Sequence, residues 1–367
     1  MLNHGIKVGI VAPRSPKYSG GVEKLIGETA RVLSNYGKVK VEIYCTGKEE
    51  KHEDNEHYRL HQYRGYTEVF CYSGRLRKDL ERADADIIHA HDFTTYIPHA
   101  ASYASKGIIP VVLNTHYHAK GSTPVFNLLR TIYDPIFGKR VLETARRIVC
   151  GSYEEVMNLS MRFPNVRNKI RIITPGVDID RIRAAKPYFR CREGKKLALY
   201  VGRLERYKNV HLLVNAIKYL PNFSLVIVGK GPEDKRIRSQ IVSEGLGNRV
   251  KVICGIDDES VHRWYASCDV FVTLSDIESF GITVIEALAA GKPVVVNRCS
   301  ALGEFETKFP NSVLGVDART VSGKELARAI EKRASIEPEK EDLREYSWEN
   351  VGKKLMSLYE EVLNEWR

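Results

Sequence analysis

Short apolar runs alternate with longer amphipathic segments along most of the chain, a pattern typical of parallel α/β structure. At 367 residues the chain is longer than one hydrophobic core usually serves, so two domains are expected. We predict an α/β protein with two doubly wound parallel sheets, in residues 1–175 and 176–347. The predicted strands are 7–12, 40–44, 87–90, 110–114 and 148–150 in the first domain and 196–201, 224–228, 250–253, 270–273, 293–296 and 312–315 in the second.

Amphipathic segments between these strands predict helices, which are 22–36, 135–145, 210–219, 233–244, 260–266, 282–290 and 323–331. The domain boundary falls within 174–195, which contains Pro175-Gly176, Pro187 and a polar run. The last segment, 348–367, has apolar residues at helical spacing and is predicted to be an amphipathic helix. The polar stretch 48–57 is predicted to be a mobile loop.

The composition indicates a cytoplasmic protein. No stretch reaches the roughly 20 consecutive apolar residues that a membrane-spanning helix needs. The apolar run 6–12 is interrupted by Lys7 and followed by Pro13, which suits a buried strand better than a signal peptide. The seven cysteines are odd in number and lack C-x-x-C spacing, which argues against a disulfide framework and against structural zinc. A reducing compartment is therefore expected.

The net charge of +11 is unevenly distributed. Residues 1–175 carry 26 Lys and Arg against 18 Asp and Glu, whereas the remainder carries 31 against 28. A basic first domain suggests an acidic partner, such as a phosphorylated acceptor or peripheral contact with an anionic membrane; ordinary solubility is the alternative. No nucleic-acid partner is expected, because the basic residues are spread among acids and no aromatic-plus-basic motif is present.

Two glutamates, Glu278 and Glu286, flank Gly281 at the predicted start of helix 282–290. The N-terminus of a helix presents unpaired N–H groups and partial positive charge, which suit a phosphate. The glutamates can face one ligand there, and a carboxylate can accept two hydroxyl hydrogen bonds, as from a ribose or a sugar ring. The alternative is that both are solvated surface charges, although Glu286 lies in an otherwise apolar segment.

Other candidates follow from the rule that ligands of open α/β sheets bind beyond the carboxyl ends of the strands. Gly20 and Gly21 follow the first strand and precede a helix, a geometry suited to phosphate; a flexible turn is the alternative. Arg203 and Lys208 follow strand 196–201 and can clamp a diphosphate leaving group, unless they belong to a solvated basic loop. 

Histidines follow two strands of the first domain. His116 comes after strand 110–114, and His91-Asp92 after strand 87–90. A lone histidine is more often structural, so neither position alone establishes a function. A zinc site of His89, His91, His116 and His118 lacks support from any carboxylate or third-ligand arrangement.

An ordered set of motifs spans nearly the whole chain, and the set resembles a known family. The motifs are Gly20-Gly21, Thr115-His116, Pro175-Gly176-Val177-Asp178, Tyr200-Val201-Gly202-Arg203-Leu204, Lys208-Asn209, Val228-Gly229-Lys230-Gly231-Pro232 and the Glu278–Glu286 segment with Ala287-Leu-Ala-Ala-Gly291-Lys-Pro-Val-Val. Each is weak alone. Together they resemble the large retaining glycosyltransferase family (family 4-like, group 1) that includes sucrose synthases and many lipid and polysaccharide glycosyltransferases.

The resemblance implies a GT-B fold: two Rossmann-like domains facing a cleft, with the C-terminal helix crossing back onto the first domain. It implies that Arg203 and Lys208, but not Arg206, hold the diphosphate, and that His116 lies by the anomeric centre. Glu278 would contact the transferred sugar and Glu286 the ribose. The other implied donor contacts are Gly20, Gly21, Gly202, Gly229, Gly231, Ile256, Phe280, Gly281 and Ile282.

The resemblance further implies a metal-independent transfer, with retention, from a nucleotide-diphosphate sugar to a hydroxyl acceptor, without another cofactor. The acceptor is expected to be held by loops 48–72 and 116–132, and neither its identity nor the donor base and sugar follow from the sequence. Two alternatives are kept: a sugar-nucleotide epimerase on the same architecture, and a non-catalytic nucleotide-sugar binding protein.

Overall fold

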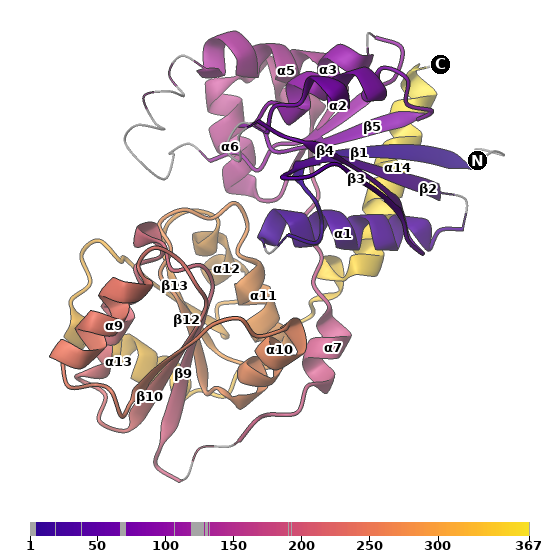
Figure 1. The fold of residues 1–367 in the computed structure, drawn as a ribbon. Helices are drawn as coiled ribbons and strands as arrows, with labels where there is room; N and C mark the ends of the chain where they lie inside the picture. Colours follow the sequence, from indigo (N-terminus) through magenta and orange to yellow (C-terminus); the bar gives the residue numbers. More distant parts are fainter. Residues whose placement is uncertain are drawn as a thin grey trace. The chain divides into compact units, whose positions relative to one another are not determined.

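The computed structural model of the protein describes residues 5–18, 20–37, 39–66, 71–105, 107–118, 128, 131, 133–189, 191 and 193–366. The chain divides into two compact units. Unit 1 comprises Met1–Gly176 and Trp348–Arg367, and unit 2 comprises Val177–Ser347. Each unit is a sheet with helices on both faces (Figure 1).

Unit 1 contains an eight-stranded sheet in the order β3-β4-β2-β1-β5-β6-β7-β8. All neighbouring pairs are parallel except β3 with β4. The strands are β1 (Ile6–Arg14), β2 (Val39–Gly47), β3 (Lys51–Asp54), β4 (Arg59–Arg64), β5 (Ile87–His91), β6 (Val111–Asn114), β7 (Arg147–Cys150) and β8 (Ile170–Ile172). The helices include α1 (Gly21–Ser34), α2 (Gly74–Leu80), α3 (Ile97–Ser105), a π-helix η1 (Asp134–Gly138), α5 (Lys139–Thr144), α6 (Tyr153–Arg162), a 3₁₀ turn η2 (Pro164–Lys169) and α14 (Trp348–Trp366).

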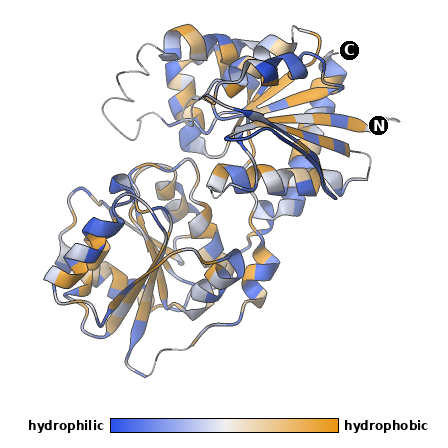
Figure 2. Ribbon diagram, viewed as in Figure 1, coloured by the Kyte–Doolittle hydropathy of each residue, from blue (hydrophilic) through white to orange (hydrophobic). Residues whose placement is uncertain are grey.

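The central strands of this sheet are apolar on both sides, because helices cover both faces. Val8 and Ile10 of β1 pack with α1 and α14, whereas Val11 packs with α2, α3 and α5 on the other face. Figure 2 shows the strands of unit 1 largely in the hydrophobic colour, while its helices carry both colours. Helix α14 approaches α1 closely at Gly352, where a Cβ would overlap Val32.

Unit 2 contains a six-stranded, fully parallel sheet in the order β11-β10-β9-β12-β13-β14. The strands are β9 (Lys196–Val201), β10 (Phe223–Val228), β11 (Val250–Ile253), β12 (Val270–Thr273), β13 (Val294–Asn297) and β14 (Val313–Val316). The helices include α7 (Ile179–Ala184), α8 (Val210–Ile217), α9 (Asp234–Ser243), α10 (Asp258–Ser267), α11 (Ile282–Ala289), α12 (Leu302–Lys308) and α13 (Gly323–Ala334), with 3₁₀ turns η3 (Arg206–Lys208) and η4 (Arg344–Tyr346).

The direction of winding in unit 2 reverses between β9 and β12. Helices α8, α9 and α13 cover one face, and α7, α10, α11 and α12 cover the other. Side chains alternate accordingly: Leu197 and Leu199 of β9 face the second group, and Ala198 and Tyr200 face the first. In open sheets of this kind, ligands bind outside the carboxyl ends of the strands at such a reversal.

The predicted fold class is confirmed, and every predicted strand is present near its expected position. The prediction of a loop at 48–57 was wrong, because Lys51–Asp54 forms β3 and pairs with β4 at the sheet edge. Three of its four residues are exposed, so the strand lacks the apolar alternation by which buried strands are recognised. Strands β4 and β8 and helices α2, α3, α6, α7 and α12 were not predicted either.

Candidate active site

The loops that follow β9 and β10 of unit 2 are joined at the carboxyl edge of the sheet. The amide N–H of Leu204 donates to the carbonyl of Lys230 at 3.0 Å. The backbones lie so close that a Cβ on Gly229 would overlap the carbonyl oxygen of Gly202, and one on Gly231 would overlap that of Leu204. Positions 229 and 231 therefore require glycine for close backbone approach.

The β9 loop is also joined to the loop between β12 and α11. Asn209, in the left-handed region at φ +54°, donates through Nδ2 to the carbonyl of Leu274 at 2.9 Å. This arrangement places Lys208 next to Glu278, and the two side chains form an ion pair. They remain 13% and 21% exposed. The pair is therefore accessible from the solvent side, where a ligand can compete for either charge.

Arg203 follows the end of β9, and its side chain is exposed. Its Nη2 donates to the hydroxyl of Tyr207 at 2.7 Å, and Nη1 lies 3.8 Å from a carboxylate oxygen of Glu205. The side chain is 68% exposed, so these contacts hold it weakly. The backbone is fixed more firmly, because the buried hydroxyl of Tyr200 donates to the carbonyl of Arg203 at 2.8 Å.

Helix α11 begins at Gly281 without a side-chain cap or an acidic residue in its first turn. Gly281 has φ +100°, and a Cβ there would lie 2.7 Å from Leu302. Phe280 is buried against Phe305, and Ile282 is half-buried. The buried ring before the glycine thus fixes the turn, and the first N–H groups of the helix can serve an anion.

Glu286 lies one turn into α11, and its partner comes from α10. The hydroxyl of Tyr265 donates to Oε2 of Glu286 at 2.8 Å. Tyr265 is fully buried, and burial followed by the charge of Glu286 raises its pKa well above the usual value. The phenol therefore stays protonated and orients the carboxylate, which retains lone pairs for a ligand. Ile256 follows β11 after Gly255, which has φ +71°, and packs partly against the same core.

In unit 1, His116 follows β6 in the left-handed region at φ +47°. Its Nε2 lies 3.5 Å from Nδ1 of His91, and the two rings are stacked. The ring of His91 also lies 4.5 Å from that of His89, tilted by 32°. Nδ1 of His89 lies 2.7 Å from the hydroxyl of Tyr359 on α14. Burial lowers the pKa of all three histidines, that of His89 to about 3. The three imidazoles are therefore neutral near pH 7.

Gly20 and Gly21 lie at the N-terminus of α1, after β1. A Cβ on Gly20 would overlap the carboxylate of Glu23, whereas no atom of the described residues lies within 4 Å of a Cβ at Gly21. Glu23 is buried and lies 3.6 Å from Arg14. The carboxylate folds back over the helix start, so the anion-binding groups expected at Gly20 already have a negative neighbour in this structure.

The predicted site residues fall into two sets. Unit 2 brings together the loops bearing Gly202, Arg203, Lys208, Gly229, Gly231, Ile256, Glu278, Phe280, Gly281, Ile282 and Glu286, and unit 1 holds Gly20, Gly21 and His116. His91, at the end of β5, is only 1% exposed. Residues 67–70 and most of 119–132, within the expected acceptor loops, lie outside the described residues.

Sequence reasoning missed Tyr265 and Glu155, which hold Glu286 and the His116 loop respectively. Both partners are distant in sequence, so no local spacing identifies them.

In the described part of the chain, no group of three or more His, Cys, Asp or Glu residues is arranged to hold a metal ion. Among the described helices, none combines the length and the apolar character needed to cross a bilayer. The seven cysteines, all among the described residues, form no disulfide.

Comparisons with known proteins identify the family of the chain. The family model "Glycosyl transferases group 1" matches residues 183–349, and "Glycosyltransferase Family 4" matches residues 19–181. An uncharacterized glycosyltransferase of Methanocaldococcus jannaschii is 29% identical over 75% of each chain. A D-inositol 3-phosphate glycosyltransferase of Corynebacterium urealyticum is 26% identical over 60% of this chain, which spans 58% of that relative.

Solved structures show the same fold. Sucrose-phosphate synthase from Thermosynechococcus elongatus aligns with a TM-score of 0.78 over 98% of this chain and 100% of that one, at 19% identity. Anabaena HepE, solved in complex with UDP and glucose, aligns with a TM-score of 0.73 over 97% and 99% of the two chains, at 18% identity. Structural neighbours of the chain, sucrose-phosphate synthase among them, are GT-B glycosyltransferases. The two adjacent family matches, together with the relatives, show that the chain is an enzyme of the group 1, family 4-like glycosyltransferases.

Proposed function

We propose that this glycosyltransferase moves a sugar from a nucleoside-diphosphate sugar to a hydroxyl acceptor, with retention of anomeric configuration and without an essential metal. One observation carries the proposal. The cations of the β9 loop, the uncapped start of α11 and the oriented carboxylate of Glu286 all lie at the carboxyl edge of the unit 2 sheet, where its winding reverses. Positive groups for a diphosphate and a hydrogen-bond acceptor for the ribose hydroxyls thus lie at the same edge of the sheet.

Each group has a role in this proposal. Arg203, Lys208 and the N–H groups of α11 stabilise the charge that develops on the diphosphate as the sugar departs, the task that a metal performs elsewhere. Glu286 accepts the ribose hydroxyls, and Glu278 accepts hydroxyls of the transferred sugar once Lys208 turns to the phosphate.

The bond changes of the proposed step balance without another reactant. The bond from the anomeric carbon to the phosphate oxygen breaks, and the bond to the acceptor oxygen forms on the same face. The proton of the acceptor hydroxyl passes to the departing phosphate. His116, neutral because burial lowers its pKa, lies by the anomeric centre in this proposal and can exchange hydrogen bonds with the sugar.

Transfer measured on three variants tests the assignment. Arg203→Ala and Glu286→Ala should each reduce turnover by orders of magnitude. Arg206 is an exposed cation of the same loop, and Arg206→Ala should leave turnover near the wild-type value. Near-normal turnover in both of the first two variants would refute the site. Conversion of a nucleotide sugar without any acceptor would instead indicate an epimerase.

The finer features have separate tests. Retention is checked by the anomeric configuration of the product, and metal independence by transfer in the presence of a chelator. We also propose a cytoplasmic location. Peripheral contact through the basic residues of unit 1 predicts flotation with anionic vesicles, and a protein that stays in solution in that assay would dismiss it.

A further inference from the structure

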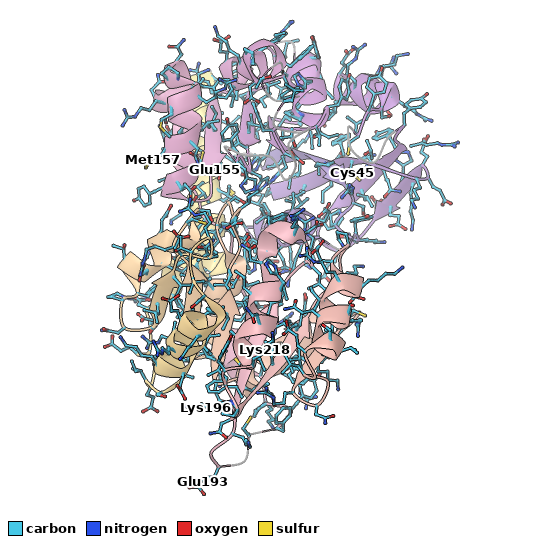
Figure 3. All side chains as sticks on the ribbon, turned by 90° about the vertical axis from the view of Figure 1, so that its left-hand side faces the viewer. Cys45, Glu155, Met157, Glu193, Lys196 and Lys218 are labelled. Atoms are coloured by element: carbon cyan, nitrogen blue, oxygen red, sulfur yellow. The ribbon has the colours of Figure 1, made fainter. Side chains whose placement is uncertain are left out.

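Glu155 is a buried carboxylate that the proposed transfer step does not use. It is the third residue of α6, and only 2% of it is exposed. Figure 3 labels it on α6 together with Met157, whose side chain is 62% exposed on the outer face. Burial raises the pKa of Glu155 to about 7, against the opposing effect of its hydrogen bonds. Such a costly group needs a specific explanation.

The hydrogen bonds of Glu155 surround His116. Its Oε1 accepts from the hydroxyl of Thr115 and from the amide N–H of Tyr117, both at 2.6 Å. Its Oε2 accepts from the amide N–H of Gly151 at 2.7 Å, at the end of β7. One carboxylate oxygen therefore holds the residues on both sides of His116, and the other fixes the carboxylate to the end of the neighbouring strand.

The backbone of His116 explains why such a clamp is needed. His116 has φ +47°, a left-handed conformation that residues with a Cβ rarely adopt and that surrounding contacts must maintain. The two hydrogen bonds that Glu155 accepts, one from each neighbour of His116, are placed to hold this conformation.

Helix capping does not account for Glu155. The sequence Ser152-Tyr-Glu-Glu155 has the spacing of a capping box, in which the glutamate would return to the N–H of the capping serine. In α13 the same spacing forms that box, with Glu325 accepting from the N–H of Ser322 at 2.9 Å. In α6 the serine caps the helix, at 3.2 Å to the N–H of Glu155, but the carboxylate is directed to the His116 loop.

We infer that Glu155 is a positioning residue, which holds the His116 loop in its left-handed conformation and thereby aims the imidazole at the transferred sugar. The inference rests on the proposed function, because His116 acts on the sugar only if the protein is a sugar transferase of the kind proposed. The clamp itself, however, can be tested by stability alone.

Glu155→Gln preserves the shape of the side chain but replaces an acceptor by a donor. We expect kcat for transfer to fall about 10- to 100-fold with little change in donor KM, since displacement of a reacting group by about 1 Å costs on that order. Glu325→Gln, in the capping box of α13, is the matched control and should keep kcat within about twofold. Normal kcat in folded Glu155→Gln overturns the inference. So does an equal further loss when Glu155→Gln is added to His116→Ala.

A second experiment is independent of activity. Glycine adopts the left-handed conformation without strain, so Glu155→Gln should shift the urea midpoint less in a His116→Gly background than in wild type. Equal shifts in both backgrounds overturn the clamp, and unequal shifts with no detectable transfer refute the proposed function while leaving the clamp intact. If Glu155→Gln does not fold, Thr115→Val should lower kcat while Thr115→Ser retains it; equal kcat in these two variants overturns the inference.

Discussion

At the scale of the residue, close backbone contacts constrain the candidate donor site more tightly than its charges do. Arg203 is exposed and held by weak contacts, but the backbone beside it admits no side chain at Gly229. The charged groups can thus rearrange around a ligand while the peptide groups stay in place. Such a division suits a site that must bind a diphosphate and later release it.

Gly229→Ala should therefore destabilise unit 2. The added Cβ would overlap the carbonyl oxygen of Gly202, and overpacking of this kind costs about 1–3 kcal/mol. Gly247→Ala is the control, because nothing lies within 4 Å of its Cβ. Urea unfolding measures both variants, and equal midpoints would show that the β9 and β10 loops are not in contact.

Tyr265→Phe should weaken donor binding without unfolding the protein. The change removes only the hydroxyl that donates to Glu286 at 2.8 Å, and a hydrogen bond to a charged group contributes about 1.5–3 kcal/mol. We expect the donor Kd to rise roughly tenfold or more, as titration calorimetry can determine. An unchanged Kd would mean that Tyr265 does not orient Glu286 for the ligand.

At the scale of the element, the sequence predicts the buried strands. It does not identify residues whose contacts are distant in the sequence. Strands β1, β9 and β12 are apolar on both faces, so they were recognised directly. The sequence of β3 indicates a loop, because an edge strand needs no apolar side. Tyr265 and Glu155 could not be assigned, since the atoms they contact, on Glu286 and near His116, are placed by the fold alone.

Helix α14 should stabilise unit 1 mainly through its apolar face. Leu358→Ala, at a buried position against α1 and the sheet, is expected to cost about 2–5 kcal/mol. Ser357→Ala, one residue away and exposed, should change stability by less than about 0.5 kcal/mol. Similar urea midpoints for the two variants would contradict the packing of this helix.

At the scale of the whole molecule, the buried histidines of unit 1 link stability to pH. Burial lowers the pKa of His89 to about 3 and also lowers the pKa values of His91 and His116. The charge of Asp92 acts in the opposite direction on the pKa of His116. Below about pH 6.5 the unfolded chain binds protons that the folded chain does not. The stability contributed by His89 is therefore fully present above that pH and is lost as the pH falls, by about 1.4 kcal/mol per pH unit, because its folded pKa of about 3 lies well below this range.

Replacement of one histidine should reduce this dependence. His89→Asn can still accept the hydroxyl of Tyr359, and it should lower the slope of unfolding free energy between pH 6.5 and pH 5 by about one proton. His52→Asn, at an exposed position of β3, serves as the control. The same slope in wild type and His89→Asn would show that His89 is accessible to protons in the folded protein.

The donor site at the carboxyl edge of the unit 2 sheet is tested most directly by thermal unfolding with UDP, GDP and ADP. A nucleoside diphosphate at 100 times its Kd should stabilise the protein by about 2.7 kcal/mol. We predict a rise in the unfolding temperature of wild type and Arg206→Ala with at least one of the three, and little or none with Arg203→Ala or Glu286→Ala. Equal rises in all four proteins would contradict the site.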